Sequence, residues 1–213
     1  MMNDIVKTDG KQLFTDFLLQ NFDDGGLINK FEALTKLYFE VNSVINISAI
    51  RTESDVYIKH YLDSIYPYKY FVGRCCDVGC GGGFPCLPLA IATGLDFVGL
   101  DSVGKKLTLI NRCVKELRLN NISAVHSRAE DLAKQGELFD TVSARAVSDV
   151  DKTLSYCAPL AKKGGKIVLY KTQNDNPALS STESKLKIRL SETKDYTLLN
   201  TDIKRRVFVY DKL

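Results

Sequence analysis

The stretch Arg74-Cys75-Cys76-Asp77-Val78-Gly79-Cys80-Gly81-Gly82-Gly83-Phe84-Pro85 decides the fold of this chain of 213 residues. It predicts a short buried strand, a glycine loop and the first turn of a helix, because glycine permits a sharp turn and proline suits a helix start. The glycines match the pattern GxGxG, whereas the GxGxxG of dinucleotide enzymes requires glycine where Phe84 stands. The loop therefore predicts a ligand lying against the backbone, and Phe84 argues against a dinucleotide.

Strand and helix patterns alternate from Arg74 onward. This alternation predicts a Rossmann-like α/β fold, with a mostly parallel sheet, right-handed crossovers and helices on both faces. The predicted strands lie near residues 74–78, 96–101, 123–127, 139–144 and 166–170, and the predicted helices near 84–93, 104–119, 130–134 and 150–160. The tail predicts a helix near 183–190 and two weaker strands near 196–199 and 207–210.

Three amphipathic helices precede the sheet. They predict a helical N-terminal extension over residues 1–71, and residues 72–213 then form the ligand-binding domain as one compact unit. Asp9 and Gln12 have the spacing of a capping box at the start of the first helix.

The third of these helices has a polar face. Thr52 and Asp55 form a second pair with cap spacing and predict where this helix begins. At 100° per residue, His60, Asp63 and Ser64 project from the face opposite its apolar residues. This polar face is either exposed to solvent or lines a site.

The composition fits one domain of ordinary size, and 45% hydrophobic residues suffice for a single core. Residues 1–7 contain an acidic residue and no apolar run, and no stretch approaches the length that spans a membrane. We therefore expect a cytoplasmic protein without membrane contact. The six cysteines form no CxxC pair and only two histidines are present, so we expect buried, reduced thiols and no metal site.

The net charge of +3 is unevenly distributed along the chain. Residues 150–213 hold 13 Lys and Arg against 7 Asp and Glu, whereas residues 1–149 hold 16 against 19. Basic clusters at 162–166, 185–189 and 204–206 suit a phosphate backbone, but such runs are also typical of a solvated surface. Charge alone leaves nucleic acid binding open.

Polar residues lie at the carboxyl ends of four of the predicted strands. Because the carboxyl ends of parallel strands meet at one edge, Asp77, Asp101 and the segments 127–130 and 143–146 are expected to face one crevice. Asp101, eighteen residues after Gly83, is placed to accept hydrogen bonds from both hydroxyls of a ribose. The GxGxG loop followed by this acid favours S-adenosylmethionine over a dinucleotide.

Five motifs carry a family resemblance: His60-Tyr61-Leu62-Asp63-Ser64, the GxGxG stretch from Asp77 to Pro85, Leu100-Asp101-Ser102, Ser127-Arg128-Ala129-Glu130, and Ser143 with Arg145-Ala146. Together they resemble the bacterial small-subunit (16S) ribosomal RNA guanine-N7 methyltransferases, formerly called glucose-inhibited division protein B. The resemblance extends from about Asn46 to Lys171. It departs from the family pattern at Cys80, where Thr or Ser is usual, and at Cys86 and Thr172, where Gly is usual.

The resemblance implies a class I methyltransferase that transfers a methyl group from S-adenosylmethionine to N7 of a guanine in 16S ribosomal RNA. N7 carries an exposed lone pair, so no general base is needed and catalysis is mainly alignment. The implied partner is small-subunit ribosomal RNA, and we expect a monomer. The cofactor residues implied are Asp77, Gly79, Gly81, Gly83, Phe84, Asp101, Ala129, Glu130 and Arg145, and the candidates for binding RNA are His60, Asp63, Ser64 and Lys171.

Within these residues, the resemblance implies separate roles. Gly79 and Phe84 hold the amino-acid end of the cofactor, Asp101 the ribose, and Ala129 with Glu130 the adenine. Arg145 binds the cofactor carboxylate or a substrate phosphate, and a surface ion pair is the structural alternative.

Two other function classes remain open. A methyltransferase of the same fold acting on a small molecule would work without RNA. A noncatalytic RNA-binding module would not bind S-adenosylmethionine. A nicotinamide dehydrogenase is disfavoured by Phe84.

Overall fold

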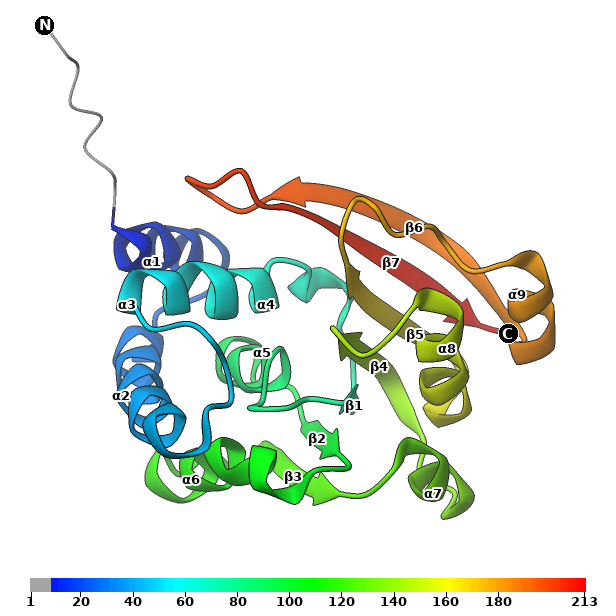
Figure 1. Ribbon diagram of the computed structural model, residues 1–213, viewed down its shortest axis with the longest axis horizontal. Coiled ribbons are helices and arrows are strands. Elements are labelled where there is room, and N and C mark those ends of the chain that lie inside the picture. The colour runs from blue at the N-terminus through cyan, green and yellow to red at the C-terminus, as the bar shows by residue number, and fades with distance from the viewer. Residues whose placement is uncertain (1–8) are drawn as a thin grey trace, which may run out of the picture.

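A sheet of seven strands, in the order β3-β2-β1-β4-β5-β7-β6, runs through the computed structural model, which describes residues 9–213 (Figure 1). The parallel strands are β1 (Cys75–Val78), β2 (Phe97–Asp101), β3 (Ile122–His126), β4 (Phe139–Arg145) and β5 (Ala161–Lys171). At one edge, β7 (Lys204–Lys212) is antiparallel to both β5 and β6 (Ile188–Thr197). The chain winds outward in both directions from β1 and β4, and this confirms the predicted mostly parallel sheet.

Helices cover both faces of the sheet, as predicted. One face packs against α5 (Cys86–Thr93), α6 (Thr108–Glu116) and the N-terminal helices, and the other packs against α7 (Ala129–Lys134), α8 (Val150–Cys157) and α9 (Ser180–Leu186). The 3-10 turns η3 (Gly104–Leu107) and η4 (Ala158–Leu160) precede α6 and follow α8. Cys75 and Cys76 enter the two different cores because successive strand residues point to opposite faces. All six cysteines are buried with free thiols, as predicted.

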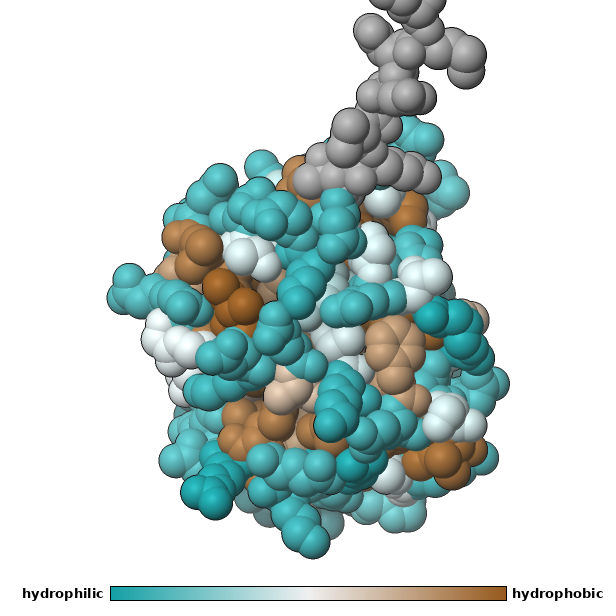
Figure 2. All heavy atoms as spheres, turned by 90° about the vertical axis from the view of Figure 1, so that its left-hand side faces the viewer, coloured by the Kyte–Doolittle hydropathy of each residue, from teal (hydrophilic) through white to brown (hydrophobic). Residues whose placement is uncertain are grey.

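The N-terminal helices are α1 (Gly10–Asn21), α2 (Leu27–Ile45) and a third helical run. This run consists of α3 (Glu53–Asp55), the π-helix η1 (Val56–Leu62) and α4 (Asp63–Ile65), and the 3-10 turn η2 (Tyr68–Tyr70) follows. Phe14 and Phe31 meet edge to face with ring centroids 4.7 Å apart, in the same core cluster as Val168 of β5 and Val209 of β7. The N-terminal helices therefore share one core with the sheet. Their outer surface, which faces the viewer in Figure 2, is mostly hydrophilic with separate apolar patches.

Of the two predicted helix caps, the one at Thr52 is present and the one at Asp9 is absent. Thr52 accepts a hydrogen bond from the Asp55 amide at 3.2 Å, which confirms the cap of the third helix. Asp9 stands at the N-cap of α1, but the prediction of a capping box is wrong because its side chain makes no cap hydrogen bond. The Gly10 amide donates instead to Ser54 Oγ at 3.0 Å, so a tertiary contact replaces the local one. The N-terminal prediction for residues 1–7 lies outside the described residues.

The polar face of the third helix is not exposed. His60, Asp63 and Ser64 are 8%, 3% and 0% exposed, because the helix packs against α1 and α5. Tyr170 of β5 donates to the Ser64 carbonyl at 2.7 Å. The alternative of a solvent-exposed face is therefore wrong, and the second alternative, that these residues line a site, applies to two of the three.

The tail elements are displaced from their predicted positions. The predicted helix near 183–190 ends at Leu186, where Lys187 adopts a left-handed conformation with φ 52°, and β6 begins at Ile188. The predicted strand near 207–210 lies within the longer β7, whereas the one near 196–199 overlaps only the last two residues of β6. Because β6 is an edge strand with most side chains exposed, its sequence lacks the apolar alternation that would predict it.

The glycine loop depends on conformations that only glycine adopts easily. Gly83 has φ 94°, and a Cβ atom there would lie 2.5 Å from Leu87 Cδ1 and 2.8 Å from Ile110 Cγ1. Gly94, at the other end of α5, has φ 71° but nothing within 4 Å of an added Cβ. An alanine at Gly94 would therefore add backbone strain alone, whereas an alanine at Gly83 would add both strain and steric overlap.

We expect Gly83→Ala to lower the free energy of unfolding by about 2–4 kcal/mol, because it combines left-handed strain with overpacking. Gly94→Ala is the matched control and should cost only about 1 kcal/mol from strain alone. Urea unfolding measures both values. Equal losses of unfolding free energy in the two variants would show that the surroundings of Gly83 can accommodate a methyl group.

Candidate active site

Asp101 holds the glycine loop against the end of β2. Its Oδ2 accepts a hydrogen bond from the Gly81 amide at 2.9 Å and its Oδ1 accepts one from the Val103 amide at 2.8 Å. A carboxylate has about four acceptor positions, so two remain for a ligand. Asp101 lines a cavity of about 340 Å³ at the carboxyl end of the strands, together with Gly79.

The predicted cofactor residues divide into two groups. Four of them line this first cavity: Gly79, Asp101, Ala129 and Glu130. The others lie around it: Asp77, Gly81, Gly83 and Phe84 belong to the loop or its support, and Arg145 lines a second, adjoining cavity. The structure thus brings the strand ends together as expected, but not every motif residue lines the first cavity.

Asp77 lies beneath the loop and is fully buried. Ser143 Oγ donates to its Oδ1 at 2.9 Å, and the Cys86 amide at the start of α5 donates to its Oδ2 at 3.3 Å. Burial raises the pKa of Asp77 to about 7, although both hydrogen bonds oppose that rise. Asp77 therefore joins β1, β4 and α5 and makes the platform on which the loop rests.

The second cavity, of about 530 Å³, adjoins the first and shares Ala146 and Ser148 with it. Basic side chains dominate its charged lining, since Lys59, Arg145, Lys171 and Arg205 face only the acids Asp63 and Asp175. Lys171 also donates a hydrogen bond to the Ser148 carbonyl, where the cavities meet. The cavity therefore has an excess of positive charge.

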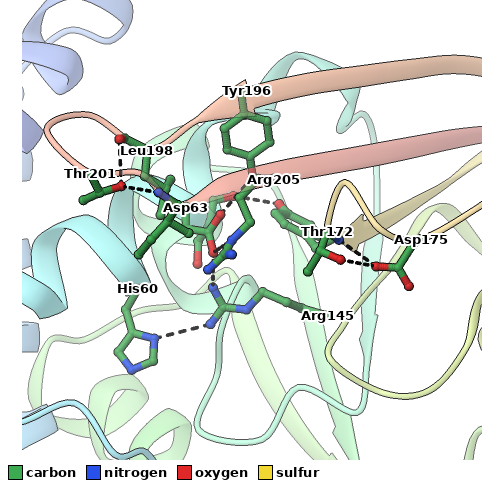
Figure 3. A network of polar contacts seen from close by, with 12 residues as sticks. His60, Asp63, Arg145, Thr172, Asp175, Tyr196, Leu198, Thr201 and Arg205 are labelled. Atoms are coloured by element: carbon green, nitrogen blue, oxygen red, sulfur yellow. Dashed lines mark hydrogen bonds and ion pairs between the residues drawn. The ribbon is translucent and has the colours of Figure 1, made fainter.

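Asp63 is the centre of a polar network in this cavity (Figure 3). The Tyr196 hydroxyl donates to its Oδ1 at 2.9 Å. Its Oδ2 accepts from Arg205 Nε at 3.2 Å and from Arg145 Nη1 at 3.4 Å. One buried carboxylate thus holds two guanidinium groups side by side.

His60 extends the network to the glycine loop. A guanidinium can only donate, so the 3.4 Å contact with Arg145 Nη2 makes His60 Nδ1 an acceptor, and Nε2 then donates to Ser48 Oγ at 3.0 Å. Burial, and then the charge of Arg145, lower the pKa of His60 to about 3, so the imidazole is neutral at pH 7. Its ring stacks on Phe84 with centroids 4.2 Å apart and planes 7° apart.

Besides Asp77, Gly81 and Gly83, the predicted residues Phe84 and Ser64 line neither cavity. Phe84 packs against His60 and lies outside the lining of both cavities, and Ser64 is fully buried with no partner for its hydroxyl among the described residues. The sequence analysis missed Tyr196 and did not single out Arg205 from its cluster. No local pattern marks either, because their partner Asp63 is 133 and 142 residues away.

The departures from the family pattern leave the site intact. Cys80 and Cys86 lie outside the cavity linings, and both sulfurs are 3.2 Å from the position of a Cβ added to Gly99 of β2. The two thiols thus fill core space beside a glycine. Thr172 lines the second cavity and donates to Asp175 Oδ2 at 2.7 Å.

A family model described as rRNA small subunit methyltransferase G, GidB, matches residues 27–209. The chain belongs to this family. The family resemblance inferred from the five motifs is confirmed, and the nicotinamide dehydrogenase alternative is wrong. Among curated relatives, the protein named ribosomal RNA small subunit methyltransferase G from Lactobacillus johnsonii is 35% identical over 82% of this chain and 78% of its own length. The one so named from Staphylococcus aureus is 35% identical over 86% and 81%.

Solved structures support the fold of this family member. The magnesium protoporphyrin IX methyltransferase of Synechocystis PCC 6803, solved with bound SAM, matches with a TM-score of 0.57 at 17% identity over 96% of this chain and 98% of that one. TrmN from Thermus thermophilus matches with a TM-score of 0.51 at 18% identity over 70% and 47%. The predicted Rossmann-like class I methyltransferase fold is confirmed.

Residues 9–213 contain neither a membrane-spanning helix nor a metal-binding cluster. No helix there combines the length and the apolar character needed to cross a membrane. That same range contains no group of three or more His, Cys, Asp or Glu side chains arranged to hold a metal ion.

The buried carboxyl of Asp77 predicts an unusual pH dependence. Between its ordinary pKa of 3.8 and about 7, the folded chain binds more protons at this site than the unfolded chain, so stability falls as the pH rises through that window. Asp77→Asn keeps an acceptor for the Cys86 amide and removes the titration. We expect it to flatten the decline in stability between about pH 4 and pH 7.

Asp140→Asn is the control with the opposite sign. The hydrogen bond from Lys162 lowers the pKa of Asp140, so this carboxyl adds stability above its unfolded pKa that is lost in acid. Urea unfolding at several pH values compares the variants. An unchanged slope in Asp77→Asn would show that Asp77 does not titrate in this window.

Proposed function

We propose that this chain transfers a methyl group from S-adenosylmethionine to N7 of a guanine in 16S ribosomal RNA. One observation carries the proposal: two cavities meet at Ala146 and Ser148, one beside the glycine loop and Asp101, the other with a basic lining. The names of the curated relatives support ribosomal RNA of the small subunit as substrate. The proposal includes a monomer acting in the cytoplasm.

The first cavity suits the cofactor. Its volume of about 340 Å³ lies within the usual range for small-molecule sites. Gly79 allows close approach of a ligand to the backbone, Asp101 retains acceptor positions for ribose hydroxyls, and Ala129 with Glu130 would border the adenine. When bound, S-adenosylmethionine supplies an electrophilic methyl group on a sulfonium.

The second cavity suits RNA. Arg145 and Arg205 keep N–H donors for phosphate oxygens, Lys171 adds positive charge, and arginine binds phosphate through paired hydrogen bonds. A base from an RNA loop is already partly unstacked and enters a cavity of this kind at low cost. We therefore assign this cavity to the target nucleotide and its flanking phosphates.

No residue of the site needs to act as a base. His60 is neutral, but its two ring nitrogens are engaged by Arg145 and Ser48. The N7 lone pair of guanine is free without deprotonation, so the reaction needs orientation rather than proton transfer. Alignment of reacting groups can supply on the order of 7–11 kcal/mol.

The small-molecule alternative is less well supported. The fold alone does not distinguish an RNA substrate from a small molecule, since the magnesium protoporphyrin IX methyltransferase has a similar fold. Four basic side chains around one cavity favour a substrate with several phosphates. Family membership also argues against the noncatalytic RNA-binding module.

The proposal is tested by incubating the protein with methyl-labelled S-adenosylmethionine and small ribosomal subunits from cells that lack this enzyme. Label should enter 16S RNA, and reduction followed by aniline should cleave the RNA at the labelled guanine. Label in another molecule, or in RNA that resists this cleavage, would contradict the proposal.

Asp101→Asn should weaken binding of S-adenosylmethionine about 10- to 100-fold. Asparagine would direct an NH₂ group at a backbone amide, and a hydrogen bond to a charged acceptor contributes about 1.5–3 kcal/mol. Asp96→Asn, at the exposed opposite end of β2, is the control and should bind normally. Calorimetry measures both; normal binding in Asp101→Asn would remove this residue from the cofactor site.

Arg145→Ala should lower the turnover of RNA methylation at least about 100-fold while leaving the affinity for S-adenosylmethionine unchanged. The reason is that Arg145 lines only the second cavity. Arg189→Ala removes an exposed arginine paired with Asp211 and should retain full turnover. Near-normal turnover of Arg145→Ala would show that the RNA binds outside the second cavity.

A further inference from the structure

Three segments that are distant in sequence meet at Asp63. This residue begins α4, Arg145 ends β4, and Tyr196 and Arg205 come from the hairpin of β6 and β7 (Figure 3). Asp63 is only 3% exposed, so its carboxylate depends on these partners in place of water. The network therefore joins the N-terminal helices to the C-terminal hairpin across the second cavity.

Arg145 is oriented from two sides within this network. Its Nη1 contacts Asp63 Oδ2 and its Nη2 contacts His60 Nδ1, each at 3.4 Å. The guanidinium carbon lies 5.9 Å from the centre of the Phe84 ring. The side chain remains 17% exposed, so it is held in place while N–H groups are left for a ligand in the cavity.

Asp63 is in turn oriented by Tyr196. The tyrosine hydroxyl binds Oδ1 at 2.9 Å, while both arginines bind Oδ2. The Tyr196 ring stacks on Tyr66 with centroids 4.0 Å apart and planes 10° apart, so packing fixes where the hydroxyl lies. Without this donor, Oδ1 would lose its hydrogen bond, and only the two arginines at Oδ2 would orient the carboxylate.

We propose that Tyr196 is a positioning residue for Arg145 and that it acts through Asp63. The inference rests on the proposed function, because it takes Arg145 as a residue that binds the RNA substrate. The C-terminal hairpin then takes part in the reaction: it fixes the direction in which the guanidinium of Arg145 meets the RNA.

Tyr196→Phe tests the proposal, since it removes the hydroxyl and keeps the ring stack. We expect turnover of RNA methylation to fall about tenfold, because displacing a substrate-binding group by a fraction of an ångström is costly. The affinity for S-adenosylmethionine should stay unchanged. Tyr66→Phe alters the other ring of the same stack and should retain normal turnover; an equal loss in both variants would overturn the proposal.

The dependence on Arg145 is tested in an Arg145→Lys background. Lysine has no planar fork, so it cannot be oriented by Asp63 and His60 in the same way. Tyr196→Phe should therefore cause less than about a twofold further loss there, which is strong non-additivity. A full tenfold loss in that background would show that Tyr196 acts by another route.

A measurement without RNA separates this inference from the proposed function. In protein labelled with ¹⁵N-arginine, the side-chain signal of Arg145 is assigned by its loss in Arg145→Lys. Tyr196→Phe should speed rotation of that guanidinium, whereas Tyr66→Phe should not. Unchanged rotation would overturn the inference, while absence of RNA methylation by the unaltered protein would overturn the proposed function alone.

Discussion

The glycine loop after β1 is held between two buried carboxylates, and the rest of the site is built around this constraint. Asp101 accepts a hydrogen bond from the loop through the Gly81 amide, and Asp77 supports it through Ser143 and the Cys86 amide. The carboxylates stand at the ends of neighbouring strands, so the sheet register fixes their separation. The loop is thereby rigid before any ligand arrives, which lowers the entropic cost of binding.

The lining of the first cavity could be predicted from local patterns. Asp101, Ala129 and Glu130 follow strands whose positions are evident from alternating strand and helix signals, and parallel strands bring their carboxyl ends to one edge. Asp77 shows the limit of this reasoning. A motif residue at a strand end can point into the ligand space or beneath it, and only the packing around Ser143 and Cys86 decides which.

The lining of the second cavity could not be predicted in the same way, because its contacts are long-range and basic residues are common along the chain. Four residues of the basic clusters form ion pairs away from this cavity: Lys162 with Asp140, Lys166 and Arg189 with Asp211, and Arg206 with Asp195. Arg205 differs from its neighbour Arg206 only in the direction it takes from β7, toward Asp63. Composition therefore indicated a basic tail, whereas the fold determines which one of these side chains reaches the second cavity.

In the proposed reaction, which needs no proton transfer, these long-range contacts are functional. When catalysis is alignment, the rate depends on how firmly each partner is held, and a residue can matter without touching the reacting atoms. Residues 75–150 supply the first cavity almost alone, but the second one also needs His60 and Asp63 from the N-terminal helices and Arg205 from the C-terminal hairpin. The terminal segments therefore complete the lining of the second cavity, and the shared core holds the N-terminal helices against the sheet.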